Sequence, residues 1–304
     1  MTGPTDDAPA AETFASGWLA LREPFDLAAR AEALPGLDLQ AALFRAQDGP
    51  EPLHVLDLGC GTGANLRALA PQLGRMQQHW TLLDHDPLLL GTLAPAMAHW
   101  CTAHGFEWQP VGAASARIVA PAWQATLHWQ QADLAARLDA LPLAGQHLVT
   151  ASALLDLVCG EWLQRLFTRI AATDAAMLFA LTVDGRHAWS PRLVGDARVQ
   201  AQFASHQRRD KGLGGPALGP EALPFAAHAL ARLGYTQSQS ASDWRIEAKD
   251  QAMLLAMIDG LADAAMAQAP QARAGIEAWR LRRRSRAGET RLRVGHADLL
   301  AWRG

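Results

Sequence analysis

The sequence predicts an α/β protein built on a doubly wound, mostly parallel sheet of seven strands. Short apolar runs, which are typical of buried strands, alternate along the chain with segments whose apolar residues recur at helical spacing. A glycine-rich turn at 59–63 follows the first of these runs and precedes a helical segment. Hydrophobic residues make up 50% of the 304 residues, which is enough to bury a large core.

The first two thirds of the chain supply most of this pattern. Residues 1–20 are expected to form a disordered tail, and residues 25–44 two short helices separated at Pro35-Gly36. The alternation that follows is typical of parallel strands joined by helices. Strands are predicted at 53–58, 80–83, 125–129, 147–151 and 177–183, and helices at 66–73, 87–101 and 162–170.

The last third departs from strict alternation. Residues 186–220 are polar and rich in Gly and Pro, which predicts a long lid-like insertion after the fifth strand. A helix at 221–234 and a sixth strand at 235–240 follow. The segment 249–286 reads as an insertion of two helices before a last strand at 291–302. We therefore expect a tail, 1–20, and one domain, 21–304, with a core at 50–185.

Composition excludes several classes of protein. The net charge of -3 gives no general attraction to nucleic acids or acidic membranes. No run of 18 apolar residues suggests a membrane span, and the N-terminus lacks a secretory pattern. Cys60, Cys101 and Cys159 lie far apart, which predicts a reducing, cytoplasmic environment without disulfides or a metal site. The sequence leaves the oligomeric state open.

The glycine turn is the strongest functional signal. Gly59, Gly61 and Gly63 allow a tight turn and let a ligand approach the backbone closely. The same spacing also fits the form of the motif that binds dinucleotides. Asp57 favours a different ligand, because a carboxylate there would repel a pyrophosphate but suit a cationic ammonium or sulfonium. Its alternative role is to brace the loop.

The stretch Val55–Gly63, Val-Leu-Asp-Leu-Gly-Cys-Gly-Thr-Gly, closely resembles the first motif of class I S-adenosylmethionine-dependent methyltransferases. Leu83-Asp84-His85-Asp86-Pro87 is similar to the strand-end acid of that family, and Gln131-Ala132-Asp133-Leu134 to its third signal. The resemblance covers 50–185 and the final strand pair. It implies a Rossmann-like methyltransferase that binds S-adenosylmethionine and releases S-adenosylhomocysteine.

The resemblance also implies individual roles. Asp84 would bind the ribose hydroxyls, although NAD-binding folds use an acid at a similar distance. Asp133 would accept the adenine amino group and Leu134 would line the adenine pocket, although Asp133 could instead cap a helix. The complete set of expected cofactor-binding residues is Asp57, Gly59, Cys60, Gly61, Gly63, Asp84, His85, Asp133, Leu134 and Ala151.

The acceptor side is less well marked. Ser152 and Asp156 follow the fourth predicted strand, at the edge where α/β sheets bind ligands. The chain has no Asn-Pro-Pro-Tyr or Asp-Pro-Pro-Tyr there, which disfavours a DNA or release-factor substrate. Trp162 could form a pocket wall, although helically spaced aromatic residues usually belong to a core.

The segment 206–211 gathers His, Arg, Asp and Lys beside a glycine-rich stretch. His206 is the preferred general base, with Asp156 as the alternative base or a helix cap. Arg209 and Lys211 would recognise a polar or anionic acceptor. The same charges could instead only keep a solvated loop soluble.

The leading interpretation is methyl transfer (EC 2.1.1) to an oxygen, nitrogen or carbon of a small molecule. An RNA methyltransferase is an alternative that would use the cluster 206–211 and the arginine run 280–286. Since Trp279 is the one aromatic residue beside that run, a solvated helix face is the better interpretation of it. An NAD-dependent oxidoreductase is a further alternative, which Asp57 and Gly63 disfavour.

Overall fold

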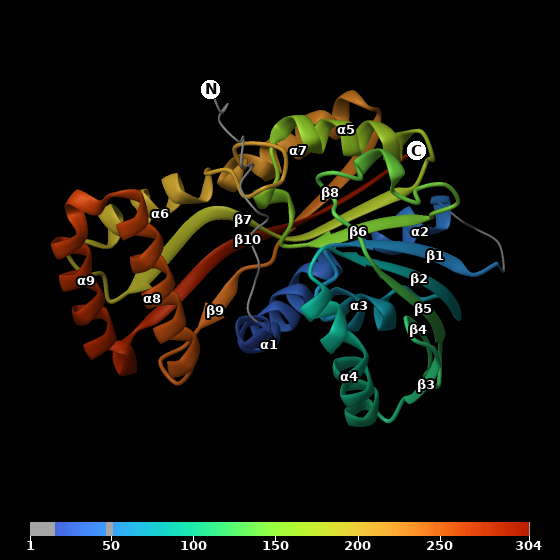
Figure 1. Cartoon of the computed structure of the whole chain (residues 1–304), viewed down its shortest axis with the longest axis horizontal. Helices are drawn as coiled ribbons and strands as arrows, with labels where there is room; N and C mark the ends of the chain where they lie inside the picture. The colour runs from blue at the N-terminus through green and yellow to red at the C-terminus, as the bar shows by residue number, and fades with distance from the viewer. Residues whose placement is uncertain (1–15, 47–50, 304) are drawn as a thin grey trace, which may run out of the picture.

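The computed structural model describes residues 16–46 and 51–303 and contains one sheet of ten strands (Figure 1). The strands follow the order β3-β4-β5-β2-β1-β6-β7-β10-β8, and β9 pairs with β10. Their bounds are β1 Leu53–Leu58, β2 Gln77–Asp84, β3 Glu107–Gly112, β4 Ser115–Val119, β5 Gln124–Gln131, β6 Leu148–Ser152, β7 Ala176–Ser190, β8 Tyr235–Ala241, β9 Trp244–Ile246 and β10 Arg291–Arg303.

The centre of the sheet is parallel. β1 pairs in parallel with β2 and β6, β2 with β5, and β6 with β7. β10 runs antiparallel between β7 and β8. The predicted doubly wound, mostly parallel sheet is therefore confirmed. The predicted count of seven strands is wrong, because the hairpin β3-β4 extends one edge and β9 adds a short strand against β10.

Two sets of helices cover the two faces of the sheet (Figure 1). α2, α3 and α4 pack with residues such as Val55 and Trp80 in one core, and α5 and α7 pack with residues such as Leu56 and Phe179 in a second. The helices are α1 Ser16–Ala33, α2 Leu39–Ala46, α3 Ala64–Leu69, α4 Pro87–His104, α5 Gly160–Ala171, α6 Asp196–Gln207, α7 Ala222–Arg232, α8 Gln251–Gln268 and α9 Arg273–Ser285.

A third core lies beyond the end of the parallel sheet, where α6, α8 and α9 pack against the extended ends of β7 and β10 (Figure 1). Its buried residues include Trp189 of β7, Val199 of α6 and Trp279 of α9. Trp18, Leu21 and Phe25 place α1 against the same core. The two predicted helices within 249–286 are thus present and help to build this core.

Two predictions about irregular segments are wrong. Residues 16–20 are not a tail, because α1 begins at Ser16; residues 1–15 lie outside the described part of the chain. The segment 186–220 is not simply a lid. β7 continues to Ser190, which pairs with Arg291, and α6 buries Val199 while most of its polar residues are half-buried. Because β7 pairs with β10 and α6 packs on α8, this segment forms regular structure despite its polar composition.

The loop that remains between α6 and α7 is hydrogen-bonded to the segment between β6 and α5. The Leu218 amide donates to the Val158 carbonyl at 2.9 Å, and the Cys159 thiol donates to the Gly214 carbonyl at 3.1 Å. These contacts hold Lys211 and Leu213 beside the carboxyl ends of the central strands. Within the described residues, no helix is both long and apolar enough to cross a membrane.

Candidate functional site

The glycine turn lies directly at the carboxyl end of β1. Gly61 adopts a φ of 52° and Gly63 a φ of 84°, both in the left-handed region that favours glycine. A Cβ on Gly63 would lie 2.1 Å from the Met97 Cε, so the Met97 methyl group would have to move to admit a side chain here. Gly59, Cys60 and Gly61 line a cavity of about 150 Å³, whereas Gly63 begins α3 behind it.

Asp84 ends the neighbouring strand β2 and lines the same cavity. Its Oδ2 accepts from the Gly61 amide at 2.7 Å, and its Oδ1 accepts from the Asp86 amide at 2.9 Å. The carboxylate is therefore fixed against the glycine turn, and each oxygen retains a lone pair for a further donor. His85 lies beside it on the cavity wall, with Nδ1 at 3.5 Å from Oδ1.

Asp133 and Leu134 follow β5, the next strand along the sheet, and both line the cavity. The Asp133 Oδ1 accepts from the amides of Ala135 and Ala136 at 2.9 and 3.0 Å, so this carboxylate braces a turn. The alternative of a helix cap is wrong, because the short 3-10 helix that follows, Leu138–Ala140, has no side-chain cap. Trp162 does not line either of the two cavities at this edge. Its buried indole donates to the Leu134 carbonyl at 3.0 Å and thereby supports the wall from behind.

Asp57 lies at the bottom of the site rather than on its surface. It is fully buried, and its Oδ1 accepts from the Asn65 amide group at 2.6 Å. Asn65 lines the cavity and accepts in turn from the Arg30 guanidinium at 2.5 Å. Burial raises the pKa of Asp57 to about 7, although the Asn65 hydrogen bond and the Arg30 charge oppose this shift.

Arg30 is a buried cation on the cavity wall. It is 2% exposed, and among the described residues its Nε and Nη2 have no hydrogen-bond partner. Burial lowers the pKa of the guanidinium, while the charges of Asp298, Asp57 and Asp26 raise it. Because an unsatisfied buried donor costs about 1–3 kcal/mol, a ligand that brings an acceptor to these nitrogens would be favoured.

Helix α1 forms one side of the cavity, which the sequence pattern did not indicate. Arg67 of α3 donates to both Glu23 oxygens, at 2.6 and 2.8 Å, and so joins α1 to the glycine turn. The charged residues of α1 on the cavity wall are Arg22, Glu23, Asp26 and Arg30. The helical spacing of these charged residues, together with Asn65 in α3, was the signal that could have predicted their place at the site. It was not decisive, because a charged helix face is usually solvated.

A second cavity of about 350 Å³ adjoins the first. Arg22, Ala153, Leu157, Leu181 and Lys211 line both cavities. Three residues expected on the acceptor side, Asp156, His206 and Lys211, come together on the second cavity. Ser152 lines the first cavity, at the end of β6.

Two further predicted residues are not at either cavity. Ala151 is 1% exposed within β6. Arg209 donates to the Gln268 side chain and to the Ala267 carbonyl, both at 2.8 Å, and so ties its loop to the end of α8. Its role in this structure is to anchor the loop. In the described ranges 16–46 and 51–303, no group of three potential metal ligands gathers.

The arginine run 280–286 is largely engaged with acids. Arg283 is fully buried, pairs with Asp196 and stacks over the Trp189 ring at 4.5 Å. Arg280 pairs with Asp263 and Arg284 with Asp259. The predicted solvated helix face is therefore wrong for Arg283, since its charge is used inside the third core.

The sequence matches no protein-family model and no curated protein. An O-methyltransferase family protein from Burkholderia thailandensis is similar in structure, with TM-score 0.41 and 15% identity over 73% of this chain. The aligned part spans 53% of that protein, about half its length. A geranyl diphosphate C-methyltransferase from Streptomyces coelicolor A3(2), solved with S-adenosyl-L-homocysteine, has TM-score 0.44 and 12% identity over 99% of this chain and 91% of that one. A mycolic acid cyclopropane synthase has TM-score 0.42 and 12% identity over 91% and 88%.

Proposed function

We propose that this chain transfers the methyl group of S-adenosylmethionine to a small-molecule acceptor. The observation that carries the proposal is the first cavity, where the glycine turn, Asp84 and Asp133 meet at the carboxyl ends of three adjacent strands, β1, β2 and β5. In open α/β sheets, ligands bind at this edge. The activated sulfonium supplies the chemistry, so the chain has mainly to bind and orient two molecules.

The polar groups of the cavity suit the parts of this cofactor. Asp84 would accept two ribose hydroxyls with the lone pairs that its backbone contacts leave. Asp133 and Leu134 would bind the adenine. Arg30, with its buried Nε and Nη2, would bind the cofactor carboxylate, while the acids beside it would suit the ammonium. Gly59, Cys60, Gly61 and His85 would form the floor, with Asp57 acting through Asn65.

The acceptor would occupy the second cavity, because this space opens directly onto the first. His206 and Asp156 line it and are the candidates for removing a proton from the acceptor. Lys211 lines both cavities and would contact the acceptor near the reacting atom. Ser152 would position the same end of the acceptor from the cofactor side.

The RNA alternative receives less support from the structure. Counterion release requires arginines that can reach phosphates. Arg280, Arg283 and Arg284 pair with acids of this chain, and Arg209 is bonded to the end of α8. A small acceptor that binds in the second cavity therefore fits these contacts better than a long polyanion does.

Isothermal titration with S-adenosylhomocysteine and with NAD tests the cofactor assignment. We expect S-adenosylhomocysteine to bind and NAD not to bind. Asp84→Ala should weaken S-adenosylhomocysteine by tenfold or more, since it removes a charged acceptor worth about 1.5–3 kcal/mol. Asp139→Ala is the matched control, because Asp139 is an exposed acid paired with Arg165. Binding of NAD alone, or equal effects of the two variants, would contradict the proposal.

A further inference from the structure

The walls of the second cavity are built mostly by segments that the parallel sheet does not require. Phe203 comes from α6, Trp244 from β9, and Met257 and Leu261 from α8. On α8, Ala256, Met257, Gly260, Leu261 and Ala264 recur at helical spacing, so one face of this helix lines the space. The third core thus supplies much of the wall of a cavity next to the proposed cofactor site.

Aromatic and aliphatic side chains dominate this lining, in which Asp156 and Lys211 are the charged groups besides Arg22. Trp18 and Trp244 meet edge to face with ring centroids 6.2 Å apart, and His187 meets Phe203 in the same way at 5.4 Å. Arg22 adds little free charge, because it pairs with Asp26 at 2.9 Å and stacks over Trp244 at 5.1 Å. Flat aromatic walls favour a flat, apolar ligand.

Two imidazoles of the cavity, those of His187 and His296, are neutral acceptors rather than cations. Burial lowers the pKa of His187, and it lowers the pKa of His296 to about 3. The His296 Nδ1 lies 3.2 Å from the Val294 carbonyl, which can only accept, so Nδ1 carries the proton and Nε2 the lone pair. A neutral acceptor nitrogen suits a ligand with an O–H or N–H donor and gives no charge to an anion.

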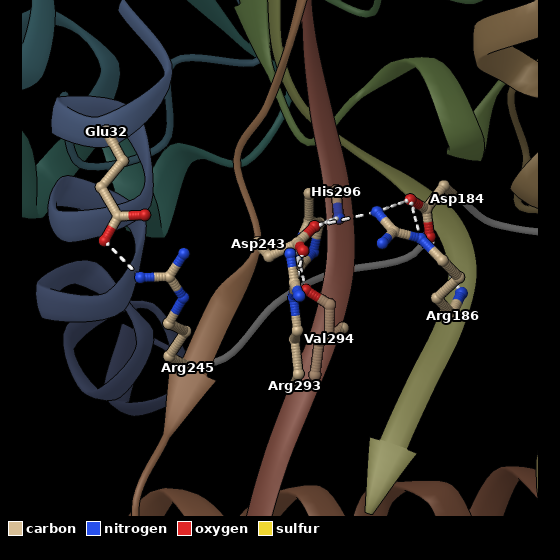
Figure 2. Close-up of polar contacts among 8 residues, drawn as sticks. All are labelled: Glu32, Asp184, Arg186, Asp243, Arg245, Arg293, Val294 and His296. Carbon is tan, nitrogen blue, oxygen red and sulfur yellow. Dashed lines mark hydrogen bonds and ion pairs between the residues drawn. The ribbon is translucent and has the colours of Figure 1, made fainter.

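Polar contacts hold the backbone of His296 in place (Figure 2). Asp243, which precedes β9, accepts from the His296 amide at 3.1 Å and from Arg186 of β7 at 3.0 Å, and it pairs with Arg293 of β10. Arg245 of β9 pairs with Glu32 of α1 at 2.9 Å. The Asp243 contacts thus join β7 and β10 to the segment before β9 beside His296, and the exposed Arg245–Glu32 pair adds a contact to α1.

Backbone strain is concentrated where the two cavities meet. Ala153 has a φ of 52° and Leu181 a φ of 55°, although neither is glycine. The Leu181 amide donates to the buried Asp298 carboxylate at 2.8 Å, and the Ala153 amide to the Ala180 carbonyl at 2.9 Å. Such conformations are unfavourable for residues other than glycine and are retained mostly at functional sites. Both residues line both cavities, so the strained backbone lies at their junction.

We propose that the second cavity binds an uncharged aromatic ring bearing a hydroxyl group, and that this hydroxyl is methylated. The inference rests on the proposed function and adds the acceptor class. The hydroxyl oxygen forms the new O–CH₃ bond as the S–CH₃ bond breaks, and S-adenosylhomocysteine leaves as a neutral thioether. The hydroxyl proton passes to His206, which lines this cavity. A thiolate or an already neutral amine would not need this base to attack the methyl group.

Binding to the complex of the full chain with S-adenosylhomocysteine tests the acceptor class. The probes are 2-naphthol, the anionic 2-naphthoate and the non-aromatic 2-decalol. We expect 2-naphthol to bind at least tenfold more tightly than either of the others, and to be the one that receives label from methyl-labelled S-adenosylmethionine. Equal or tighter binding of 2-naphthoate or 2-decalol overturns the acceptor class. Failure to bind S-adenosylhomocysteine overturns the proposed function instead.

Gly260→Leu provides a structural test of the same inference. Gly260 lines the second cavity, and a Cβ there meets no atom within 4 Å, so leucine should extend into the cavity without disturbing α8. Gly275→Leu on α9 is the matched control, since its Cβ also meets nothing and it lines neither cavity. Only Gly260→Leu should weaken 2-naphthol by tenfold or more, with S-adenosylhomocysteine binding kept in both. Unchanged 2-naphthol binding in Gly260→Leu places the acceptor elsewhere and overturns the inference.

Discussion

Arg30 occupies an unusual position for a cation, because it is enclosed by the protein and surrounded by acids. Asp57, Asp26 and Asp298 stabilise its charge, while its Nη1 alone has a hydrogen-bond partner among the described residues. The pKa values of all three acids are raised, chiefly by burial. A ligand carrying both a carboxylate and an ammonium would satisfy this mixture of charges better than a simple anion would.

Arg30→Met tests this role through a truncated ligand. The variant should bind S-adenosylhomocysteine about ten- to a hundredfold more weakly, because a charged hydrogen bond is worth about 1.5–3 kcal/mol. Its affinity for 5′-methylthioadenosine, which lacks the amino-acid end, should equal that of the unsubstituted protein. Arg30→Lys keeps the charge, so its affinity for S-adenosylhomocysteine should lie between those of Arg30→Met and the unsubstituted protein. Titration calorimetry measures all three, and an equal loss for both ligands would mean that Arg30 only supports the fold.

Asp57 should make stability depend on pH. Because the folded pKa of about 7 lies above the ordinary value of 3.8, the folded state holds a proton that the unfolded state releases. The free energy of unfolding should therefore fall as pH rises from about 4 to about 7, by up to about 4 kcal/mol from this group. Asp57→Asn should flatten this slope, as urea unfolding at pH 5 and pH 8 would show. An unchanged slope would assign the effect to Asp26 and Asp298.

At the scale of single residues, the sequence predicted the groups that follow strands. Gly59, Gly61, Asp84 and Asp133 could be placed together because parallel strands end at one edge of a sheet. Arg30 could not, since its contact with Asn65 depends on how α1 crosses α3, 35 residues along the chain. The local pattern of a helix does not specify which distant groups its charged face will meet.

At the scale of elements, α1 closes the first cavity and is attached through a partly buried ion pair. The Arg67 side chain is 4% exposed and that of Glu23 is 22% exposed. The Arg245–Glu32 pair on the same helix is exposed on both sides, at 59% and 54%. Exposed pairs contribute about 0–1 kcal/mol, so the Glu23 contact should be the stronger attachment of the two.

Glu23→Ala should loosen α1, with Glu32→Ala as the matched control. Amide hydrogen exchange over residues 16–33 should accelerate in Glu23→Ala and remain close to that of the unsubstituted protein in Glu32→Ala. S-adenosylhomocysteine affinity should fall severalfold in the first variant, because α1 carries a wall of the cavity. If exchange changes equally in the two variants, the Arg67 contact is not what holds the helix.

Elements were predictable where one face is buried and the period is regular. The bounds of β1 match the prediction of 53–58, because this strand is apolar throughout its centre. The hairpin β3-β4 was missed because β3 is mostly exposed and has no apolar alternation. α6 was missed for a related reason: among the residues of its twelve-residue span, Val199 is the one that is fully buried. Tertiary pairing decides such segments.

At the scale of the whole molecule, β7 and β10 connect the cores. β7 contributes Phe179 to the second core and Trp189 to the third, and β10 contributes Leu300 to the first and Leu292 to the third. Two continuous strands therefore run from the parallel part of the sheet to the third core, where α6, α8 and α9 pack. This continuity predicts that the third core unfolds together with the rest of the described structure.

Leu254→Ala tests that cooperativity without touching either cavity. Leu254 of α8 is fully buried in the third core, so its truncation should lower the free energy of unfolding by about 2–5 kcal/mol. Far-ultraviolet circular dichroism and tryptophan fluorescence should report one coincident transition. Saturating S-adenosylhomocysteine should raise the midpoint by a similar amount in the variant and the unsubstituted protein, because binding stabilises whatever unfolds together with the site. Two separate transitions, of which the ligand shifts only one, would show that the third core unfolds on its own. The acceptor cavity could then open while the cofactor site stays folded.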